Sequence, residues 1–176
     1  LLGLQSRKSS NSEVKEALQE TISRVLSISS VHEMLLDAVD GKHVSIRLLL
    51  DKIRLNALSL VGSDKRIDIA ISGDDLCIEA VKATSIALVV NELITNSLKY
   101  AFIGRDSGCI DIVVKSGNLY STISIEDNGK GFNFYEWNRD SLGLSLATIT
   151  IRDKLNGDLR FNSDSSGTKV MFDFKM

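Results

Sequence analysis

The sequence predicts an α+β protein, a two-layer α/β sandwich in which helices cover one face of a mixed sheet. Part of a helical hairpin is expected to precede it. Three observations lead to this fold class. Apolar residues recur at helical spacing through residues 14–35, and the period changes to two after Gly62. Beyond residue 66, short strands joined mainly by hairpin turns interleave with two helical segments. We therefore expect a helical region over residues 1–40 and a sandwich domain over residues 41–176.

The N-terminal region has a mostly apolar seam of the coiled-coil type. Ser12 is placed to cap the helix that carries it, and the three leucines before residue 5 look like the end of an earlier helix. Two helices cannot bury such a seam between themselves, so we expect a partner surface. The seam residues alternate at spacings of four and three: Val14, Leu18, Thr21, Val25, Ile28, His32 and Leu35.

The sandwich domain contains three predicted helices and six predicted strands. Alternating apolar and polar residues mark the strands, and a Ser-Gly-Asn turn at 116–118 predicts a hairpin. The helices are expected over residues 44–60, 82–102 and 142–155, and the strands over residues 67–71, 76–78, 110–114, 119–126, 159–161 and 170–174.

Composition excludes several classes of protein. The 176 residues carry 21 Lys and Arg against 23 Asp and Glu, a net charge of −2, which argues against a mainly electrostatic nucleic-acid binder. No apolar run approaches the ~20 residues that span a bilayer, so we expect no membrane contact by this stretch of chain. Cys77 and Cys109 stand alone, which predicts buried thiols in a reducing, cytoplasmic setting.

Familiar catalytic signatures are missing from the sequence. It contains no G-x-x-x-x-G-K-[ST] motif, which excludes the P-loop class, and no H-R-D or D-F-G motif of Ser/Thr/Tyr kinases. With two histidines, His32 and His43, neither a zinc signature nor a protease triad stands out. The remaining candidates lie in three other stretches.

The first stretch is the predicted helix between Asn91 and Phe102. On an α-helix Glu92, Asn96, Lys99 and Tyr100 share one stripe. An amide oxygen suits Mg²⁺, which takes few protein ligands together with phosphates and water, and a lysine can reach a phosphate. An ordinary amphipathic helix with a solvated polar face explains the same pattern equally well.

The second stretch is a strand that runs into a turn with two glycines. Asp127 lies at the strand end, and Gly129 and Gly131 permit close approach of the backbone to a ligand. A carboxylate accepts a hydrogen bond from the exocyclic amine of adenine, whereas guanine presents a carbonyl oxygen there. Taken alone, Asp-Asn-Gly is more often only a turn.

The third stretch, residues 141–146, opens the last predicted helix. Ser141 is placed as its N-cap, and the free N–H groups of its first turn, around Leu142, Gly143 and Leu144, form an anion site. Further on, Gly167 and Thr168 lie between the last two strands.

In this order, the three stretches and the Gly167-Thr168 turn closely resemble the ATP-binding domain of the GHKL superfamily, which includes gyrase, heat-shock chaperones, histidine kinases and MutL. Residues 91–102 resemble its N box, residues 127–131 its G1 box and residues 141–146 its G2 box. The short interval from 132 to 142 resembles the lid of a histidine kinase. Its four aromatic residues are expected either to close over ATP or to fold onto the domain's own core: Phe132, Phe134, Tyr135 and Trp137.

The helical front end is similar to the dimerisation hairpin of one sensor histidine kinase subfamily. In that subfamily the phosphate-accepting histidine lies upstream, in a His-Arg-x-Lys-Asn-Asn-Leu-Gln run that this sequence lacks. Because the sequence also opens without Met, we expect it to continue from a longer protein that carries the acceptor. His32 is then expected to be structural and His43 to be exposed.

The resemblance implies roles for the candidate residues. Asn96 would bind the Mg²⁺ that bridges the ATP phosphates, and Asp127 would receive the adenine amine, supported by Thr168 through water. Glu92 matches the position that activates water in hydrolysing relatives. Contacts with the nucleotide are also implied for Lys99, Tyr100, Gly129, Gly131, Leu142, Gly143, Leu144 and Thr168.

The implied function is phosphoryl transfer from Mg-ATP to a histidine and onward to an aspartate of a response regulator. The cofactors are then ATP and Mg²⁺, and the longer protein is expected to form a homodimer through its N-terminal helices. Two alternatives stay open: a module that senses ATP or ADP without phosphotransfer, and a GHKL serine kinase of the anti-sigma-factor type.

Overall fold

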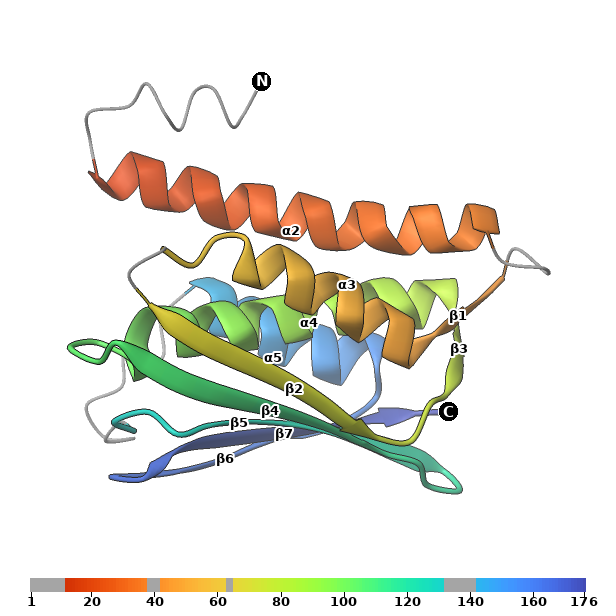
Figure 1. Ribbon diagram of the computed structural model, residues 1–176. Helices are drawn as coiled ribbons and strands as arrows, with labels where there is room; N and C mark the ends of the chain where they lie inside the picture. Colours follow the sequence, from red (N-terminus) through yellow and green to blue (C-terminus); the bar gives the residue numbers. More distant parts are fainter. Residues whose placement is uncertain (1–11, 38–41, 63–64, 132–141) are drawn as a thin grey trace.

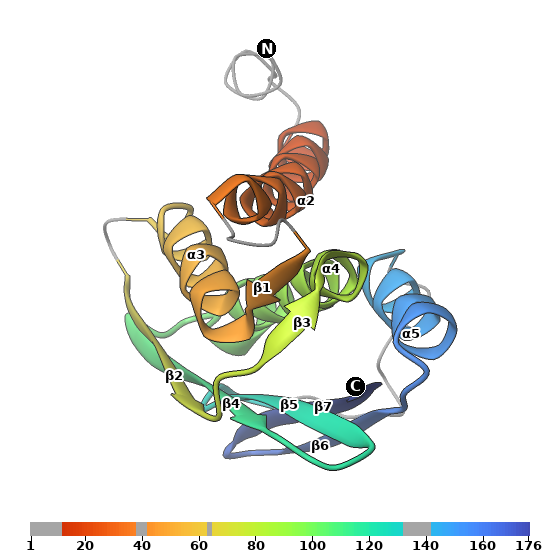
Figure 2. The same cartoon turned by 90° about the vertical axis from the view of Figure 1, so that its right-hand side faces the viewer.

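The computed structural model describes residues 12–37, 42–62, 65–131 and 142–176. A five-stranded mixed sheet forms one layer, and helices α3, α4 and α5 cover one of its faces (Figures 1 and 2). The long helix α2 lies on the outer side of α3 and α4 as a further layer. The predicted α+β sandwich with a preceding helical part is confirmed. The elements are α2 (Ser12–Asp37), β1 (His43–Ser45), α3 (Ile46–Leu58), β2 (Arg66–Gly73), β3 (Cys77–Glu79), α4 (Ala80–Asn96), the π-helix η1 (Ser97–Ala101), β4 (Ser107–Lys115), β5 (Tyr120–Asp127), α5 (Leu142–Lys154), β6 (Leu159–Asp164) and β7 (Gly167–Lys175).

The sheet has the strand order β2-β4-β5-β7-β6. Strands β2 and β4 are parallel, whereas β4 with β5, β5 with β7, and β7 with β6 are antiparallel. The predicted hairpin at residues 116–118 joins β4 to β5. A separate two-stranded ladder of β1 and β3 lies at the start of α3 and α4. It takes up Val44, which the sequence had assigned to a helix, and Ser45 caps α3 by accepting the N–H of Leu48.

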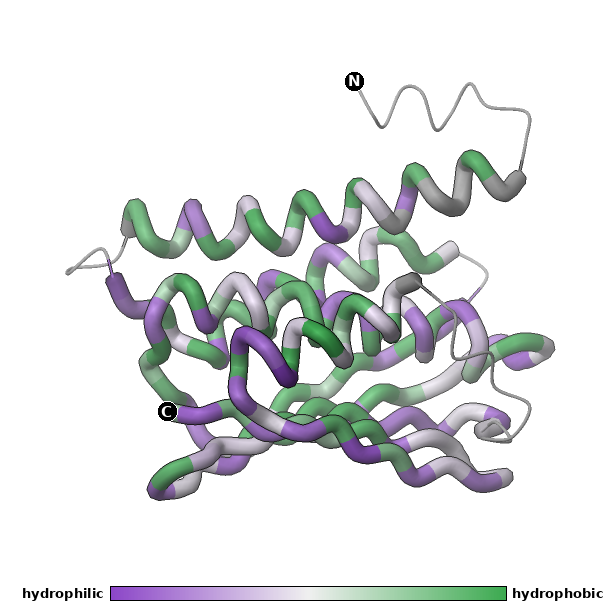
Figure 3. Tube along the Cα trace, turned by 180° about the vertical axis from the view of Figure 1, so that it is seen from behind, coloured by the Kyte–Doolittle hydropathy of each residue, from purple (hydrophilic) through white to green (hydrophobic). Residues whose placement is uncertain are grey.

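The core lies between the sheet and the three helices. Buried and exposed residues alternate along the central strands β4, β5 and β7, and hydrophobic and hydrophilic stretches change along the chain in Figure 3. On β5 and β7 the inward face carries Ile123, Ile125, Phe172 and Phe174, all buried. Helix α4 is buried along most of its length because it has the sheet on one side and α2 on the other.

Helix α2 turns a polar face toward α4. Ser23, Ser27 and Ser30 are buried, and the Ser23 hydroxyl donates to Asn91 Oδ1 of α4. Val31 and Met34 of the same helix join the main hydrophobic core. The residues of the predicted seam do not form the buried face of α2. Val14, Thr21, Val25 and His32 are exposed, and Leu18, Ile28 and Leu35 are half-buried. The seam therefore stays available for a partner.

The exposure of the two cysteines differs from the prediction. Both are exposed and free, so the prediction of buried thiols was wrong. On β4, Gly108 and Ile110 point inward, and the two-residue period turns Cys109 outward. His43 is exposed as predicted, and it lies in strand β1. Among the described residues, no helix is long and apolar enough to cross a membrane.

Candidate nucleotide-binding site

Strand periodicity places the candidate carboxylate on the helix side of the sheet. Asp127 ends β5 two residues after the buried Ile125, so its side chain points toward α4. Thr168 is its neighbour across the β5–β7 pair and lies on the same face. The two residues, 41 positions apart in sequence, thus meet at one edge of the core.

The Asp127 carboxylate is buried, with 4% of the residue exposed, and is held by three donors. Its Oδ1 accepts the N–H groups of Gly129 (3.0 Å) and Thr168 (3.2 Å), and its Oδ2 accepts the hydroxyl of Ser97 (2.8 Å). A carboxylate has about four acceptor positions, so these donors leave one on Oδ2. Thr168 supports Asp127 directly through its N–H, and its hydroxyl lies 2.9 Å from that of Ser163.

Ser97 is a residue that sequence reasoning missed. It lies at the point where α4 ends and η1 begins, and η1 widens the helix to i→i+5 hydrogen bonding. We had expected one α-helix to Phe102, so the spacing of the predicted stripe holds only to Asn96. Single π-turns inside helices are frequent at functional sites.

Replacing Ser97 with Ala tests its part in the site. Removal of its hydroxyl leaves Asp127 Oδ2 with one donor fewer and a freer orientation. We expect ATP affinity to fall roughly fivefold, because a hydrogen bond of this kind contributes about 1 kcal/mol. Isothermal titration calorimetry measures this. The matched control is Ser85→Ala, a half-buried serine of α4 whose hydroxyl donates to the Val81 carbonyl. Equal affinities for the two variants would contradict the assignment.

The glycines after Asp127 come close to the protein's own backbone. A Cβ on Gly129 would lie 2.4 Å from the Ala101 Cβ, and one on Gly131, whose φ is +63°, would lie 1.8 Å from the Asp164 carbonyl oxygen. The N–H of Lys130 also donates to the Ala101 carbonyl (3.0 Å). These contacts fasten the turn to η1 and to the β6–β7 turn, which holds Asp127 in place.

The β6–β7 turn is itself fixed by hydrogen bonds. The hydroxyl and the N–H of Ser166 both donate to Asp164 Oδ1, and these bonds hold the pKa of Asp164 below its usual value. The turn therefore presents the Asp164 backbone to Gly131 in one conformation.

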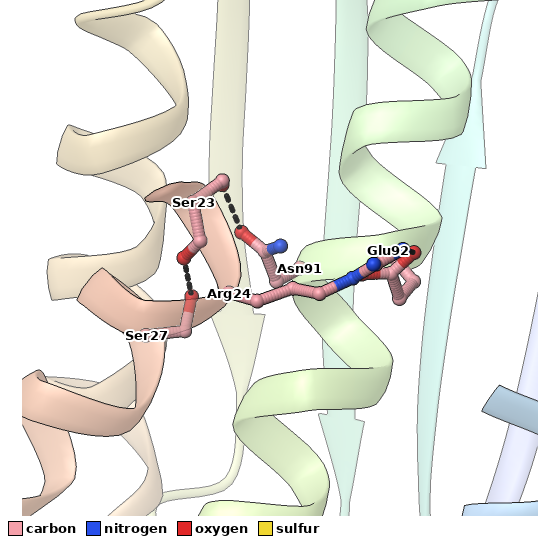
Figure 4. Close-up of polar contacts among 5 residues, drawn as sticks. All are labelled: Ser23, Arg24, Ser27, Asn91 and Glu92. Carbon is pink, nitrogen blue, oxygen red and sulfur yellow. Dashed lines mark hydrogen bonds and ion pairs between the residues drawn. The ribbon is translucent and has the colours of Figure 1, made fainter. Parts of the chain in front are cut away.

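Glu92 lies deep between helices rather than on an open stripe. Both of its carboxylate oxygens are bound by Arg24 of α2: Nε to Oε1 at 2.5 Å and Nη2 to Oε2 at 2.9 Å (Figure 4). Gly143, in the first turn of α5, touches the same pair, since a Cβ there would lie 2.3 Å from Glu92 Oε2. Three elements, α2, α4 and α5, thus meet at Glu92.

The other candidates of this helix point in different directions. Tyr100 is 56% exposed, and Asn96 is half-buried in the last turn of α4. Lys99 lines a pocket of about 260 Å³ between α2, α3 and α4. Asp127 is not among the residues that line this pocket. They are Gln19, Ser23, Ala57, Leu60, Val61, Gly62, Lys65, Ile67, Thr95, Leu98 and Lys99.

Part of the predicted site lies outside the described residues. This applies to Ser141, to the side chain of Leu142 and to the lid with its four aromatic residues. Leu144 is buried against the core, on the first turn of α5. The first turn of α5, which contains Gly143 and Leu144, therefore lies beside Glu92.

The donor set fits a magnesium ion only together with phosphates. In the described part of the chain, no group of three or more His, Cys, Asp or Glu side chains could hold a metal ion. Mg²⁺ usually keeps several waters and binds one or two protein groups plus substrate phosphates. A single amide oxygen from Asn96 is compatible with that pattern.

Comparison with known families agrees with the fold. The profile described as "Histidine kinase-, DNA gyrase B-, and HSP90-like ATPase" matches residues 81–176, which include Glu92, Asn96, Asp127 and Thr168. A second profile, described as "Histidine kinase", matches residues 1–61. The chain belongs to the family of histidine kinase-, gyrase B- and HSP90-like ATPases.

The curated relatives that the chain resembles are sensor histidine kinases. The chain is 31% identical over 175 residues to sensor histidine kinase PdtaS of Mycolicibacterium smegmatis, covering 97% of this chain and 35% of that protein. The PdtaS of Mycobacterium tuberculosis is 32% identical over the same shares of both chains. The chain thus spans about a third of the length of these relatives.

Solved structures show the same fold at lower identity. The blue-light activated histidine kinase EL346 of Erythrobacter litoralis matches with a TM-score of 0.80 and 21% identity, over 94% of this chain and 51% of that one. The catalytic domain of histidine kinase ThkA matches with a TM-score of 0.63 and 17% identity, over 76% of this chain and 94% of that one.

Proposed function

We propose that this chain binds Mg-ATP and transfers its γ-phosphoryl group to a histidine, from which it passes to a response-regulator aspartate. The observation that carries this proposal is the Asp127 carboxylate. It is buried, held by three donors, and has one acceptor position left on Oδ2. The exocyclic amine of adenine donates to such a position, whereas the carbonyl oxygen of guanine is repelled by it.

The end of α4 and the start of α5 would hold the triphosphate. Asn96 would supply an oxygen to the magnesium ion, which neutralises charge on the β- and γ-phosphates. The free N–H groups of the first turn of α5, at residues 142–144, attract anionic oxygens. Lys99 lies three residues beyond Asn96 but lines the pocket between α2, α3 and α4, so its side chain would have to turn toward the phosphates to add a positive charge there.

In the transfer step, one imidazole nitrogen attacks the γ-phosphorus in line. The new N–P bond forms as the bond to the ADP oxygen breaks, and ADP leaves with the electron pair. The proton on the other imidazole nitrogen would go to a base. The candidate at this end of the site is Glu92, whose carboxylate is bound by Arg24 in this arrangement. The contribution of the protein is positioning and charge neutralisation, as in other phosphoryl transfers.

The partners follow from the same proposal. The exposed seam of α2 would pair with a second copy of the chain, because Val14 and Val25 are apolar and exposed in this arrangement. The acceptor histidine would lie in the preceding part of the longer protein. The sensor histidine kinase PdtaS relatives match this chain over 35% of their length.

The test uses radiolabelled Mg-ATP and a separately supplied dimerisation hairpin that carries the acceptor histidine. We expect ATP binding by calorimetry and label on the hairpin that is stable to base and labile to acid. Binding without transfer would favour a nucleotide-sensing module. Absence of both would contradict the proposed function.

A further inference from the structure

The peptide group between Asn128 and Gly129 is hydrogen-bonded at both of its ends. Its N–H, on Gly129, donates to Asp127 Oδ1 (3.0 Å). Its carbonyl oxygen, on Asn128, accepts a hydrogen bond from Arg105 Nη1 (2.6 Å). A trans peptide group is planar, so its N–H and C=O point in opposite directions and rotate together. A side chain that holds the carbonyl therefore also holds the N–H that Asp127 accepts.

The glycine at position 129 makes this orientation easy to lose. Glycine adopts positive and negative φ with similar ease, so the peptide group before it can flip at little steric cost. A flipped peptide would present the Asn128 carbonyl oxygen to the Asp127 carboxylate, and the two oxygens would repel each other. A larger residue cannot replace the glycine, because a Cβ on Gly129 would lie 2.4 Å from the Ala101 Cβ. The orientation of the peptide group therefore depends on its hydrogen-bond partners.

Strand β4 holds Asn128 from the other side. The N–H of Asn128 donates to the Cys109 carbonyl (3.2 Å), and its Oδ1 accepts the Cys109 N–H (2.8 Å). Neither bond involves the Asn128 carbonyl, so neither prevents rotation of the peptide group that follows. The contact with Arg105 supplies that restraint.

Arg105 reaches the turn because the chain reverses just after η1. The Arg105 N–H donates to the Phe102 carbonyl (3.2 Å), which closes a four-residue turn. The third residue of this turn, Gly104, has a φ of +75°, a conformation that favours glycine. At steps of four residues, this segment makes three contacts with the turn after β5: Ser97 with Asp127, Ala101 with Lys130 and Arg105 with Asn128.

The charge of Arg105 adds to its effect on the peptide group. A cation at the carbonyl oxygen polarises the peptide and makes its N–H a stronger donor. Arg105 is exposed, so salt and water screen its direct attraction to distant phosphates. The contact with the Asn128 carbonyl is the route by which Arg105 acts on the site.

We propose that Arg105 is a positioning residue for adenine recognition. By holding the Asn128 carbonyl, it keeps the Gly129 N–H on Asp127 Oδ1 and leaves Oδ2 oriented for the adenine amine. This inference rests on the proposed function, because it concerns the carboxylate that would bind the base.

The test compares Arg105→Ala with Arg66→Ala by calorimetry with ATP and with ADP. Arg66 is exposed at the start of β2, and its backbone N–H, which alanine retains, donates to the Asp106 carbonyl (2.7 Å). We expect Arg105→Ala to weaken ATP and ADP by the same factor, roughly three- to fivefold, the effect of one hydrogen bond. The loss should persist at high salt, and Arg66→Ala should bind as the wild type does.

Two further measurements separate positioning from a general effect on the fold. In the nucleotide-free protein, the Gly129 amide signal should move upfield in Arg105→Ala and its hydrogen exchange should speed up, while the melting temperature changes little. Arg105→Lys keeps a charged donor that can reach a carbonyl, so it should restore most of the affinity and of the Gly129 signal.

The outcomes distinguish this inference from the proposed function. Wild-type affinity in Arg105→Ala, a loss that disappears at high salt, or an unmoved Gly129 signal would overturn the positioning role. The proposed function would stand in each of these cases, because the wild type binds ATP. If the wild type binds no ATP, the proposed function fails and the inference with it.

Discussion

Replacing Asp127 with Asn is expected to lower the affinity for ATP about a hundredfold, or roughly 2.7 kcal/mol. Asn keeps the shape of the side chain, and its oxygen can still accept the N–H groups of Gly129 and Thr168. Its amide nitrogen then takes the place of Oδ2 and faces the adenine amine. The amide N–H of the introduced asparagine and the adenine amine are both donors, so they repel each other. The hydrogen bond that the Asp127 carboxylate would accept from the nucleotide is lost.

The same variant should bind GTP better relative to ATP, because the new amide can donate to the guanine carbonyl oxygen. Calorimetry with both nucleotides measures this, and the melting temperature verifies the fold. Asp111→Asn, at an exposed position on β4, is the matched control and should bind ATP as the wild type does. Retention of wild-type ATP affinity by Asp127→Asn would remove the basis for the adenine assignment.

Replacing Asn96 with Ala is expected to slow Mg²⁺-dependent phosphotransfer about 10²- to 10³-fold, the usual effect of losing one group that stabilises charge in a transition state. The side chain is half-buried at the end of α4, so the fold should persist. ATP binding in the absence of Mg²⁺ should change little, since the base is held at Asp127.

The rate is measured as label on the supplied hairpin, with Mg²⁺ titrated over a wide range. Asn162→Ala, at an exposed position on β6, controls for the loss of any amide. A full rate for Asn96→Ala at the Mg²⁺ concentration that saturates the wild type would show that the metal does not depend on this residue.

Local patterns in the sequence were enough to predict most of the fold. The two-residue period after Gly62 marked the strands of the sheet, and the hairpin turn at residues 116–118 joined two of them correctly. The stretch at Asp127 was recognised because a short motif encodes a strand end and its turn. Each of these features depends on residues that are close together in the chain.

Contacts between distant segments could not be predicted in this way. The pairing of β5 with β7 brings Thr168 to Asp127, and the docking of α2 brings Arg24 to Glu92 across 68 residues. The spacing of apolar residues predicted a regular α-helix and gave no indication of the π-helix at Ser97. This π-helix brings the Ser97 hydroxyl to Asp127. The buried face of α2 was not predicted, because its serines are typical of the solvent-exposed face of an amphipathic helix.

The most direct test is a crystal structure of this chain with a non-hydrolysable ATP analogue and Mg²⁺. The account predicts the adenine amine within hydrogen-bonding distance of Asp127 Oδ2 and the phosphates between Asn96 and the first turn of α5. An analogue seated instead in the pocket between α2 and α3, or no analogue at saturating concentration, would contradict it.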